Sequence, residues 1–130
     1  MKKKIDLVVL GGSGLIGNEI VKKFLSENKS ILNLDIKNNL YSHDNYYFRK
    51  FDMSQNNIKN KLENIFKIYS YPKTFIDCSY INKTFFRNSS IEKISKDKLD
   101  LILSKWLSST VIISSFFLKN MKKNRIKGNI

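Results

Sequence analysis

Short apolar runs alternate along the chain with longer segments whose apolar residues recur at helical spacing. The runs predict strands buried on both faces, as in a parallel sheet, and they lie at Ile5–Leu10, Ile31–Ile36, Tyr46–Phe51 and Lys73–Cys78. The periodic segments predict helices with one buried face, at about 14–26, 57–69 and 96–123. This alternation indicates an α/β fold built on a parallel sheet.

Breaks in the pattern set the expected ends of the helices. Pro72 is expected to end the second helix, and Gly128 to stop the third after its basic last turn. Apolar residues cover more than half of the circumference of the third helix, so we expect it to pack on two sides. Residues Tyr80–Ser95 are polar and are expected to be irregular, whereas Gly128–Ile130 resembles the start of a fifth strand. The first helix is expected to bury Leu15, Ile16, Ile20, Val21, Phe24 and Leu25.

The connections between the strands restrict the topology. Crossovers between parallel strands are right-handed, which favours the strand order 3-2-1-4 with helices on both faces. The sequence therefore predicts a truncated, doubly wound Rossmann-type parallel sheet. A sheet that stops there leaves its fourth strand as an exposed edge and one side of the third helix uncovered, so we expect this chain to associate when it is alone.

A glycine-rich turn joins the first strand to the first helix. Gly11, Gly14 and Gly17 have the spacing G-x-x-G-x-x-G. In a nucleotide-binding turn, the first glycine permits the tight turn, the second lets the backbone approach a pyrophosphate, and the third lets the helix pack closely on the strand. Free N–H groups of the first helical turn attract phosphate. Glycine turns occur in every fold, and the position between a strand and an amphipathic helix is what makes this one indicative.

The acidic residue Asp35 lies near the end of the second predicted strand. A carboxylate at this place can accept hydrogen bonds from both hydroxyls of an adenosine ribose and repels a 2′-phosphate, which favours NAD over NADP. Lys37 lies close by in sequence and would weaken that preference. The alternative is an aspartate at the start of a loop, with no ligand.

Three sequence features together resemble the short-chain dehydrogenase/reductase family: the GGSGLIG turn, the LDI step that holds Asp35, and Asp52-Met53-Ser54 after the third strand. The resemblance covers nearly all of this chain but only about the first half of a family domain, and it is nearest to the flagellin-modification and nonulosonate branch. It implies that Asp52 hydrogen-bonds near the adenine and that Met53 packs on the ring. The cofactor-binding residues are then expected to be Gly11, Ser13, Gly14, Leu15, Ile16, Gly17, Asp35, Asp52, Met53, Cys78 and Ser79.

The chain departs from the family pattern at three places. Asp77–Tyr80 stands where the family has N-N-A-G, and Trp106 stands near an Asn that helps to hold a catalytic water. The catalytic Ser and the helical Tyr-x-x-x-Lys, whose Tyr is the acid/base for hydride transfer, are missing. Tyr69 and Lys73 have that spacing, but Pro72 intervenes and the segment leads into a strand, so the match is a coincidence. No catalytic residue is predicted.

The resemblance therefore implies one NAD(P)-binding Rossmann-type domain over residues 1–130, incomplete at the C-terminus. Its expected function is the NAD-binding half of a short-chain oxidoreductase that is inactive alone. It would be a fragment of an interrupted or split enzyme, a cofactor-binding module without catalysis, or a non-functional remnant. Its partner would be a complementary C-terminal half or a second copy. A second copy is expected because the corresponding helix of the family packs in a four-helix dimer contact.

Composition adds one alternative function. The formal net charge of +13 suits nucleic acid or an acidic membrane surface, so a basic interaction module competes with the NAD-binding half. The lysines are spread along the chain, with short clusters at Lys2–Lys4 and Lys119–Lys127. Since no zinc-finger, helix-turn-helix or RRM signature accompanies them, specific nucleic-acid binding is not expected.

The remaining candidate residues are expected to be structural. Cys78 is the only cysteine, which excludes an intrachain disulfide, and a buried apolar role suits it better than a reactive thiol. His43 has no Cys or His cluster around it in sequence, so no metal site is expected. No signal peptide is visible, and Leu107–Leu118 falls short of the about 20 residues of a membrane span. We therefore expect a cytoplasmic protein with a buried helix here.

Overall fold

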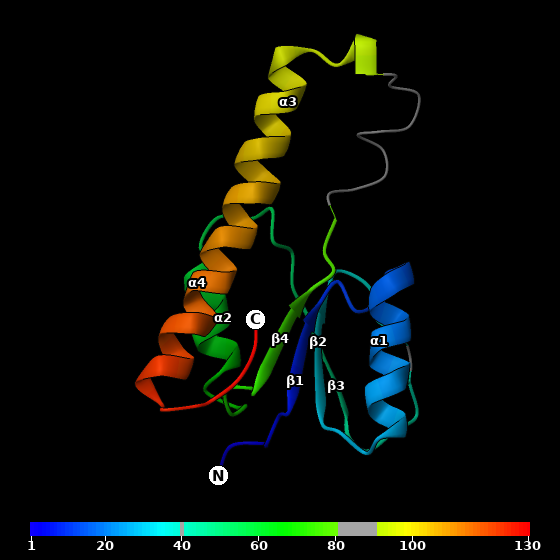
Figure 1. The fold of residues 1–130 in the computed structure, drawn as a ribbon, viewed down its shortest axis with the longest axis vertical. Helices are drawn as coiled ribbons and strands as arrows, with labels where there is room; N and C mark the ends of the chain where they lie inside the picture. Colours follow the sequence, from blue (N-terminus) through cyan, green and yellow to red (C-terminus); the bar gives the residue numbers. More distant parts are fainter. Residues whose placement is uncertain (40, 81–90) are drawn as a thin grey trace.

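The structure is a computed structural model, and it describes residues 1–39, 41–80 and 91–130. Its centre is one parallel sheet in the order β3-β2-β1-β4 (Figure 1), which confirms the predicted order 3-2-1-4. Each strand lies inside the run predicted for it and is shorter by one or two residues. The strands are β1 (Leu7–Leu10), β2 (Ile31–Asp35), β3 (Tyr46–Lys50) and β4 (Thr74–Asp77).

Helices cover both faces of the sheet, as predicted. Helix α1 (Leu15–Ser26) lies on one face, while α2 (Ile58–Ile65) and α4 (Ser108–Lys123) lie on the other (Figure 1). The second face holds the larger apolar cluster, in which Phe75 of β4 stacks on Phe117 of α4 with ring centroids 4.2 Å apart. The chain therefore has the doubly wound α/β fold that the sequence predicts.

A single long helix rises along the second face and projects past the carboxyl ends of the strands (Figure 1). It comprises α3 (Lys96–Ile102), a π turn (η3, Leu103–Leu107) and α4, so its predicted limits are confirmed. The expected stop at Gly128 is wrong, because the helix already ends at Lys123 and the left-handed residue after it is Arg125, with φ +54°. Ser95 caps its start, because the Ser95 Oγ accepts a hydrogen bond from Lys98 N.

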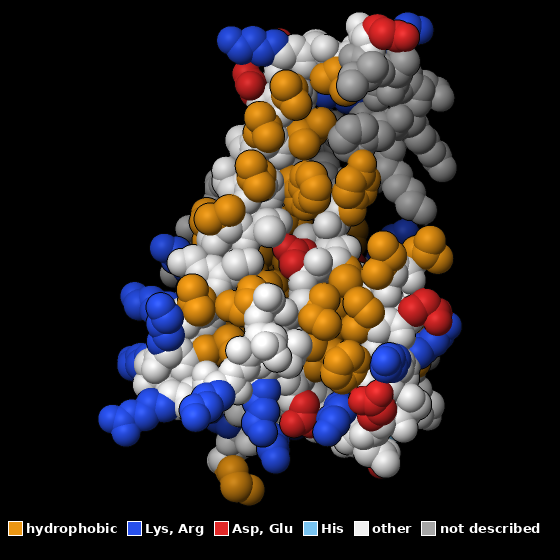
Figure 2. All heavy atoms as spheres, viewed as in Figure 1, with side chains coloured by type: hydrophobic (Ala, Val, Ile, Leu, Met, Phe, Trp, Pro, Cys, Tyr) orange, Lys and Arg blue, Asp and Glu red, His pale blue; other side chains and the backbone are white. Residues whose placement is uncertain are grey.

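The expected burial of this helix on two sides is wrong. Its inner side is buried through Ile113, Phe116, Phe117 and Met121. On its outer side Leu99, Leu103, Leu107, Val111 and Leu118 are each about half exposed, and Figure 2 shows the exposed apolar side chains along the projecting part. The reason is that the described residues cover this side only in part: the C-terminal segment leaves a hollow against Val111 and Leu118.

The helix Lys96–Lys123 is long and apolar enough to cross a membrane by length and composition, although only 28% of its most apolar window is buried. Leu107–Leu118 is only part of this continuous helix, whose 28 residues exceed the about 20 residues of a membrane span. Core helices of soluble proteins pass the same test, and the inner side of this one packs on the sheet. A membrane protein is not indicated.

Helix α2 ends before the residue that was expected to stop it. Its last residue is Ile65, so Pro72 is not the cause. The backbone groups beyond it pair with the N-terminal segment instead, since Lys3 N donates to Ile68 O and Ser70 N donates to Lys3 O. This pairing carries Tyr69 into the core, where it is 1% exposed.

The C-terminal residues lie beside β4, as the start of a fifth strand would. Asn129 N donates to Lys73 O at 3.0 Å and Phe75 N donates to Asn129 O at 3.1 Å. The pairing covers only the start of β4, and no further strand follows it in the described part of the chain. Of the segment expected to be irregular, residues 81–90 lie outside the described residues, and Ile91–Lys93 form a short 3-10 turn.

Candidate functional site

The glycine-rich turn stands at the carboxyl end of β1, in contact with both neighbouring strands. Gly11 has φ +78°, and its N–H donates to Leu34 O of β2. A Cβ on Gly11 would lie 2.8 Å from the carbonyl group of Cys78, which follows β4. A Cβ on Gly17 would lie 2.3 Å from Gly11 O. Both glycines are thus required by close backbone approach.

The first turn of α1 faces the same edge of the sheet with its amides exposed. Gly14 is the N-cap residue, no side chain caps the helix, and no acidic residue lies in its first turn. The first N–H groups of a helix lack intrahelical acceptors, so this turn can receive an anion. Leu15 and Ile16 are 90% and 70% exposed, which corrects their expected place on the buried face of the helix.

The Asp35 side chain points back to the glycine-rich turn. Its Oδ2 accepts a hydrogen bond from Ser13 N at 2.9 Å, and its Oδ1 accepts from Ile36 N at 2.6 Å and Lys37 N at 3.3 Å. A carboxylate offers about four acceptor positions, so at least one remains for a ligand. The structure therefore brings Asp35 and the turn together.

A polar residue that the sequence reasoning missed holds this turn from beneath. Asn33 lies in the middle of β2 and is fully buried. Its Oδ1 accepts from Gly12 N at 3.0 Å, and its Nδ2 donates to Ser13 Oγ and to Tyr46 OH. Buried polar groups are normally hydrogen-bonded, so an asparagine inside the apolar run ILNLD was the signal that could have revealed it.

The network continues toward the loop after β2. Tyr46 OH donates to Asn38 Oδ1 at 3.0 Å, and Ser13 Oγ donates to Lys37 O at 2.6 Å. Burial raises the pKa of the Tyr46 hydroxyl, although the hydrogen bond from Asn33 opposes the shift. Tyr46 thus stays a neutral donor at pH 7, and the turn is held in one conformation by side chains of β2 and β3.

Asp52 and Met53 follow β3 at the same edge. The Asp52 Oδ1 accepts from Ser54 N and from Ser54 Oγ. Burial of Asp52 opposes ionisation, but these hydrogen bonds and the charge of Lys61 outweigh it and lower the pKa of Asp52. The Met53 side chain is nine-tenths buried in the larger core, which leaves little of it for an adenine ring.

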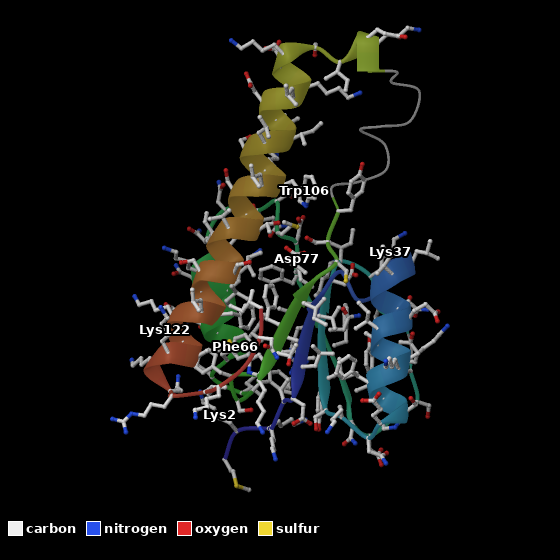
Figure 3. All side chains as sticks on the ribbon, in the orientation of Figure 1. Lys2, Lys37, Phe66, Asp77, Trp106 and Lys122 are labelled. Atoms are coloured by element: carbon white, nitrogen blue, oxygen red, sulfur yellow. The ribbon has the colours of Figure 1, made fainter. Side chains whose placement is uncertain are left out.

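The end of β4 closes the other side of the turn. Asp77 Oδ1 accepts from Ser79 N and Ser79 Oγ, while the buried Asp77 Oδ2 has no hydrogen-bond partner among the described residues. Burial, together with the charge of Asp77, raises the pKa of the Cys78 thiol. This suits the inert role expected for Cys78. Beyond the end of β4, the ring of Tyr80 meets the ring of Trp106 of the long helix edge-on, with centroids 5.8 Å apart; Figure 3 labels Trp106 and Asp77.

Tyr69 and Lys73 lie at the opposite end of the sheet from the glycine-rich turn. Tyr69 pairs with Lys3, ahead of β1, and burial raises the pKa of its hydroxyl. A catalytic acid or base must reach the reacting atom by hydrogen bond or through one water, which this position forbids for a ligand on the turn. The described residues hold no group of three or more metal-ligating side chains.

Comparisons with known proteins support the fold. No protein-family model matches the sequence, and no curated protein matches it. A short chain dehydrogenase from Leptospira borgpetersenii with bound NAD+ superposes with a TM-score of 0.77 at 23% identity, over 98% of this chain and 51% of that chain. A 4-hydroxyisoleucine dehydrogenase with NADH and succinate has a TM-score of 0.74 at 21% identity, over 94% and 55%.

An ElxO variant with NADPH bound has a TM-score of 0.76 at 16% identity, over 99% of this chain and 54% of that chain. The chain thus spans about half the length of these solved structures. Taken with the strand order and the glycine-rich turn, these likenesses show that the chain has the Rossmann-type fold of short-chain dehydrogenases.

Proposed function

We propose that residues 1–130 form an NAD-binding domain, the nucleotide-binding half of a short-chain dehydrogenase/reductase-like oxidoreductase. The observation that carries this proposal is the Asp35 carboxylate, bonded to Ser13 N at 2.9 Å beside an uncapped helix start. A pyrophosphate binds at such a helix start, and an adenosine ribose binds at such a carboxylate. The bound NAD+ and NADH of two solved structures with this fold support the assignment.

The proposed contacts divide by position. Gly11, Ser13, Gly14, Leu15, Ile16 and Gly17 would hold the pyrophosphate, and the exposed side chains of Leu15 and Ile16 would cover it. Asp52 and the small exposed part of Met53 would face the adenine, whereas Cys78 and Ser79 would line the β4 side. Asp35 would bind the ribose and disfavour the 2′-phosphate of NADP, so NAD is the preferred cofactor.

These residues do not by themselves catalyse hydride transfer in this proposal. The family uses a Ser and a Tyr-x-x-x-Lys, and Tyr69 and Lys73 lie at the wrong end of the sheet. A complementary half or a second copy would supply the catalytic groups. It would cover the open part of the β4 edge and the outer side of the long helix, and it would give the Asp77 Oδ2 a donor.

The GGSGLIG turn supports membership of the flagellin-modification and nonulosonate branch of that family. The single cysteine, Cys78, is free, which suits the reducing conditions of the cytoplasm.

The test is the thermal stability of the 130-residue chain with NAD, with NADP and without ligand. A ligand that binds only the folded state at about 100 times its Kd adds about 2.7 kcal/mol. We expect NAD to raise the Tm more than NADP does. Asp35→Asn should lose most of the rise with NAD and abolish the difference between the two cofactors.

Asp44→Asn is the matched control, because Asp44 is an exposed aspartate in the loop before β3, and it should respond to NAD as the unmodified chain does. Absence of any NAD response, combined with nucleic-acid binding that weakens steeply with salt, would reject the proposal in favour of a basic interaction module.

A further inference from the structure

An asparagine in the middle of β2 stands where a buried strand normally has an apolar side chain. Asn33 is fully buried, and its register neighbour on β1 is Val9, which belongs to the smaller apolar cluster under α1. Asparagine is disfavoured inside strands, and a polar group buried without partners costs free energy. The Asn33 amide is therefore accommodated only through its hydrogen bonds, and their partners indicate its role.

The hydrogen bonds of the Asn33 side chain reach the glycine-rich turn. Its Oδ1 accepts from Gly12 N at 3.0 Å, and its Nδ2 donates to Ser13 Oγ at 2.9 Å and to Tyr46 OH at 3.0 Å. These partners are polar but uncharged, so the network needs no counter-ion. A buried polar network whose members are all bonded makes a structure rigid, and this network fixes two successive residues of the turn.

Gly12 is required by this contact, although the spacing G-x-x-G-x-x-G does not include it. The Gly12 backbone is not left-handed. A Cβ on Gly12 would nevertheless lie 2.5 Å from Asn33 Oδ1 and 3.2 Å from Val21 Cγ2. A side chain at this position would therefore push the Asn33 amide away from Gly12 N. Gly12 and Asn33 thus depend on each other, because the glycine leaves the space that the amide occupies.

The pair sets the direction of the groups that follow in the turn. While Gly12 N donates inward to Asn33, the next amide, Ser13 N, donates to Asp35 Oδ2 at 2.9 Å. The Ser13 hydroxyl is also occupied, because it accepts from Asn33 and donates to a carbonyl of the loop after β2. Its proton is not available to a phosphate. The donors left for a phosphate are the uncapped amides in the first turn of α1.

We propose that Asn33 is a positioning residue for the pyrophosphate of the dinucleotide, a role that rests on the proposed NAD-binding function. Asn33 does not touch the ligand. It holds Gly12 and Ser13 so that the amides of the next turn are aligned before the pyrophosphate binds, which lowers the cost of ordering them on binding. The adenosine part binds at Asp35 and does not need this alignment, so Asn33 acts on phosphate-bearing ligands.

The test compares the binding of ADP and of adenosine to the ¹⁵N-labelled 130-residue chain. Asn33→Ala should weaken ADP binding about tenfold, which corresponds to the loss of about one hydrogen bond, and should change adenosine binding by less than about twofold. Val9→Ala is the matched control, because Val9 lies beside Asn33 in the sheet and is buried on the same face with an apolar side chain. It should lower the Tm and leave both affinities unchanged.

A second pair of variants separates positioning from packing. Gly12→Ala should lower the Tm, because its Cβ displaces the Asn33 amide. Combining Gly12→Ala with Asn33→Ala should recover part of that Tm, since the obstructing amide is gone. ADP affinity should stay low in the double variant, because Gly12 N still lacks its acceptor. Recovery of the affinity together with the Tm would mean that space in the turn decides binding, and it would overturn the inference.

The unmodified chain allows a measurement that needs no variant. The Gly12 amide should exchange slowly with solvent before any ligand is added, because Asn33 holds it. Exchange that slows only when ADP is added would overturn the inference, since the ligand would then order the turn. Equal weakening of ADP binding by Asn33→Ala and Val9→Ala, or of ADP and adenosine binding by Asn33→Ala, would overturn it as well. Absence of ADP and NAD binding to the unmodified chain is a different result, because it rejects the proposed function and this role with it.

Discussion

The helices on the two faces of the sheet have similar apolar sequence patterns, but they are buried to different extents. On the α1 face, the helix packs on the sheet along its whole length, since Gly17, Val21 and Leu25 are buried. On the other face, only the lower half of the long helix packs on the sheet. Apolar periodicity thus tells which side of a helix avoids water, but it does not tell what covers that side.

The long helix shows the difference within one element. Phe117 is fully buried, and Leu107 is 53% exposed, although both residues belong to the apolar pattern. A stripe of exposed apolar residues of this length marks an interaction surface on a soluble protein.

The largest expected effect is on stability, and it tests whether the inner side of the long helix is buried and the outer side is not. Phe117→Ala removes a ring that stacks on Phe75, and it should lower the free energy of unfolding by about 3–5 kcal/mol. Leu107→Ala should change it by less than about 0.5 kcal/mol and reduce self-association. Urea unfolding and light scattering measure the two quantities. Equal destabilisation by both substitutions would mean that the outer side is buried as well, and the division would be wrong.

A smaller effect tests how tightly the α1 face is closed. Gly17→Ala places a Cβ 2.3 Å from Gly11 O, whereas Gly14→Ala places one at 3.3 Å from the same atom. The first should therefore cost about 1–3 kcal/mol through overpacking, and the second much less. Thermal unfolding of the two variants measures the difference. If Gly14→Ala were the more harmful, the third glycine would not be the one required by helix packing.

The smallest effect concerns the loop that carries the chain from β3 to the second face. The lowered pKa of Asp52 means that its ionised form is stabilised by folding, so this stability is present above the ordinary pKa of 3.8 and is lost as the pH falls through the lowered value. Because the hydrogen bonds between Asp52 and Ser54 lie at the surface, where solvent weakens them, the contribution should be about 0.5 kcal/mol or less.

In Asp52→Asn, the urea midpoint of unfolding should therefore fall less between neutral and acidic pH than it does in the unmodified chain. Ser54→Ala, which removes the Oγ hydrogen bond, should show part of the same change. A pH profile of the urea midpoint that is identical in all three proteins would refute the role of Asp52 in acid stability.

The candidate site was predictable where backbone sterics or spacing decide it. The turn at Gly11–Gly17 and the position of Asp35 follow from local sequence, and the structure brings them together. Asn33 was not predicted, because its role depends on the strand neighbour that places Gly12 above it. The early end of α2 was missed for a similar reason, since a pairing with Lys3 at the far end of the chain competes with the helix.

The sequence by itself determined the elements, their order in the sheet and the glycine-rich turn, because periodicity, crossover handedness and glycine sterics act over short stretches of chain. The tertiary structure decided which apolar side chains are buried and which polar groups are satisfied. Those outcomes depend on contacts between residues far apart in sequence, and no local pattern encodes them.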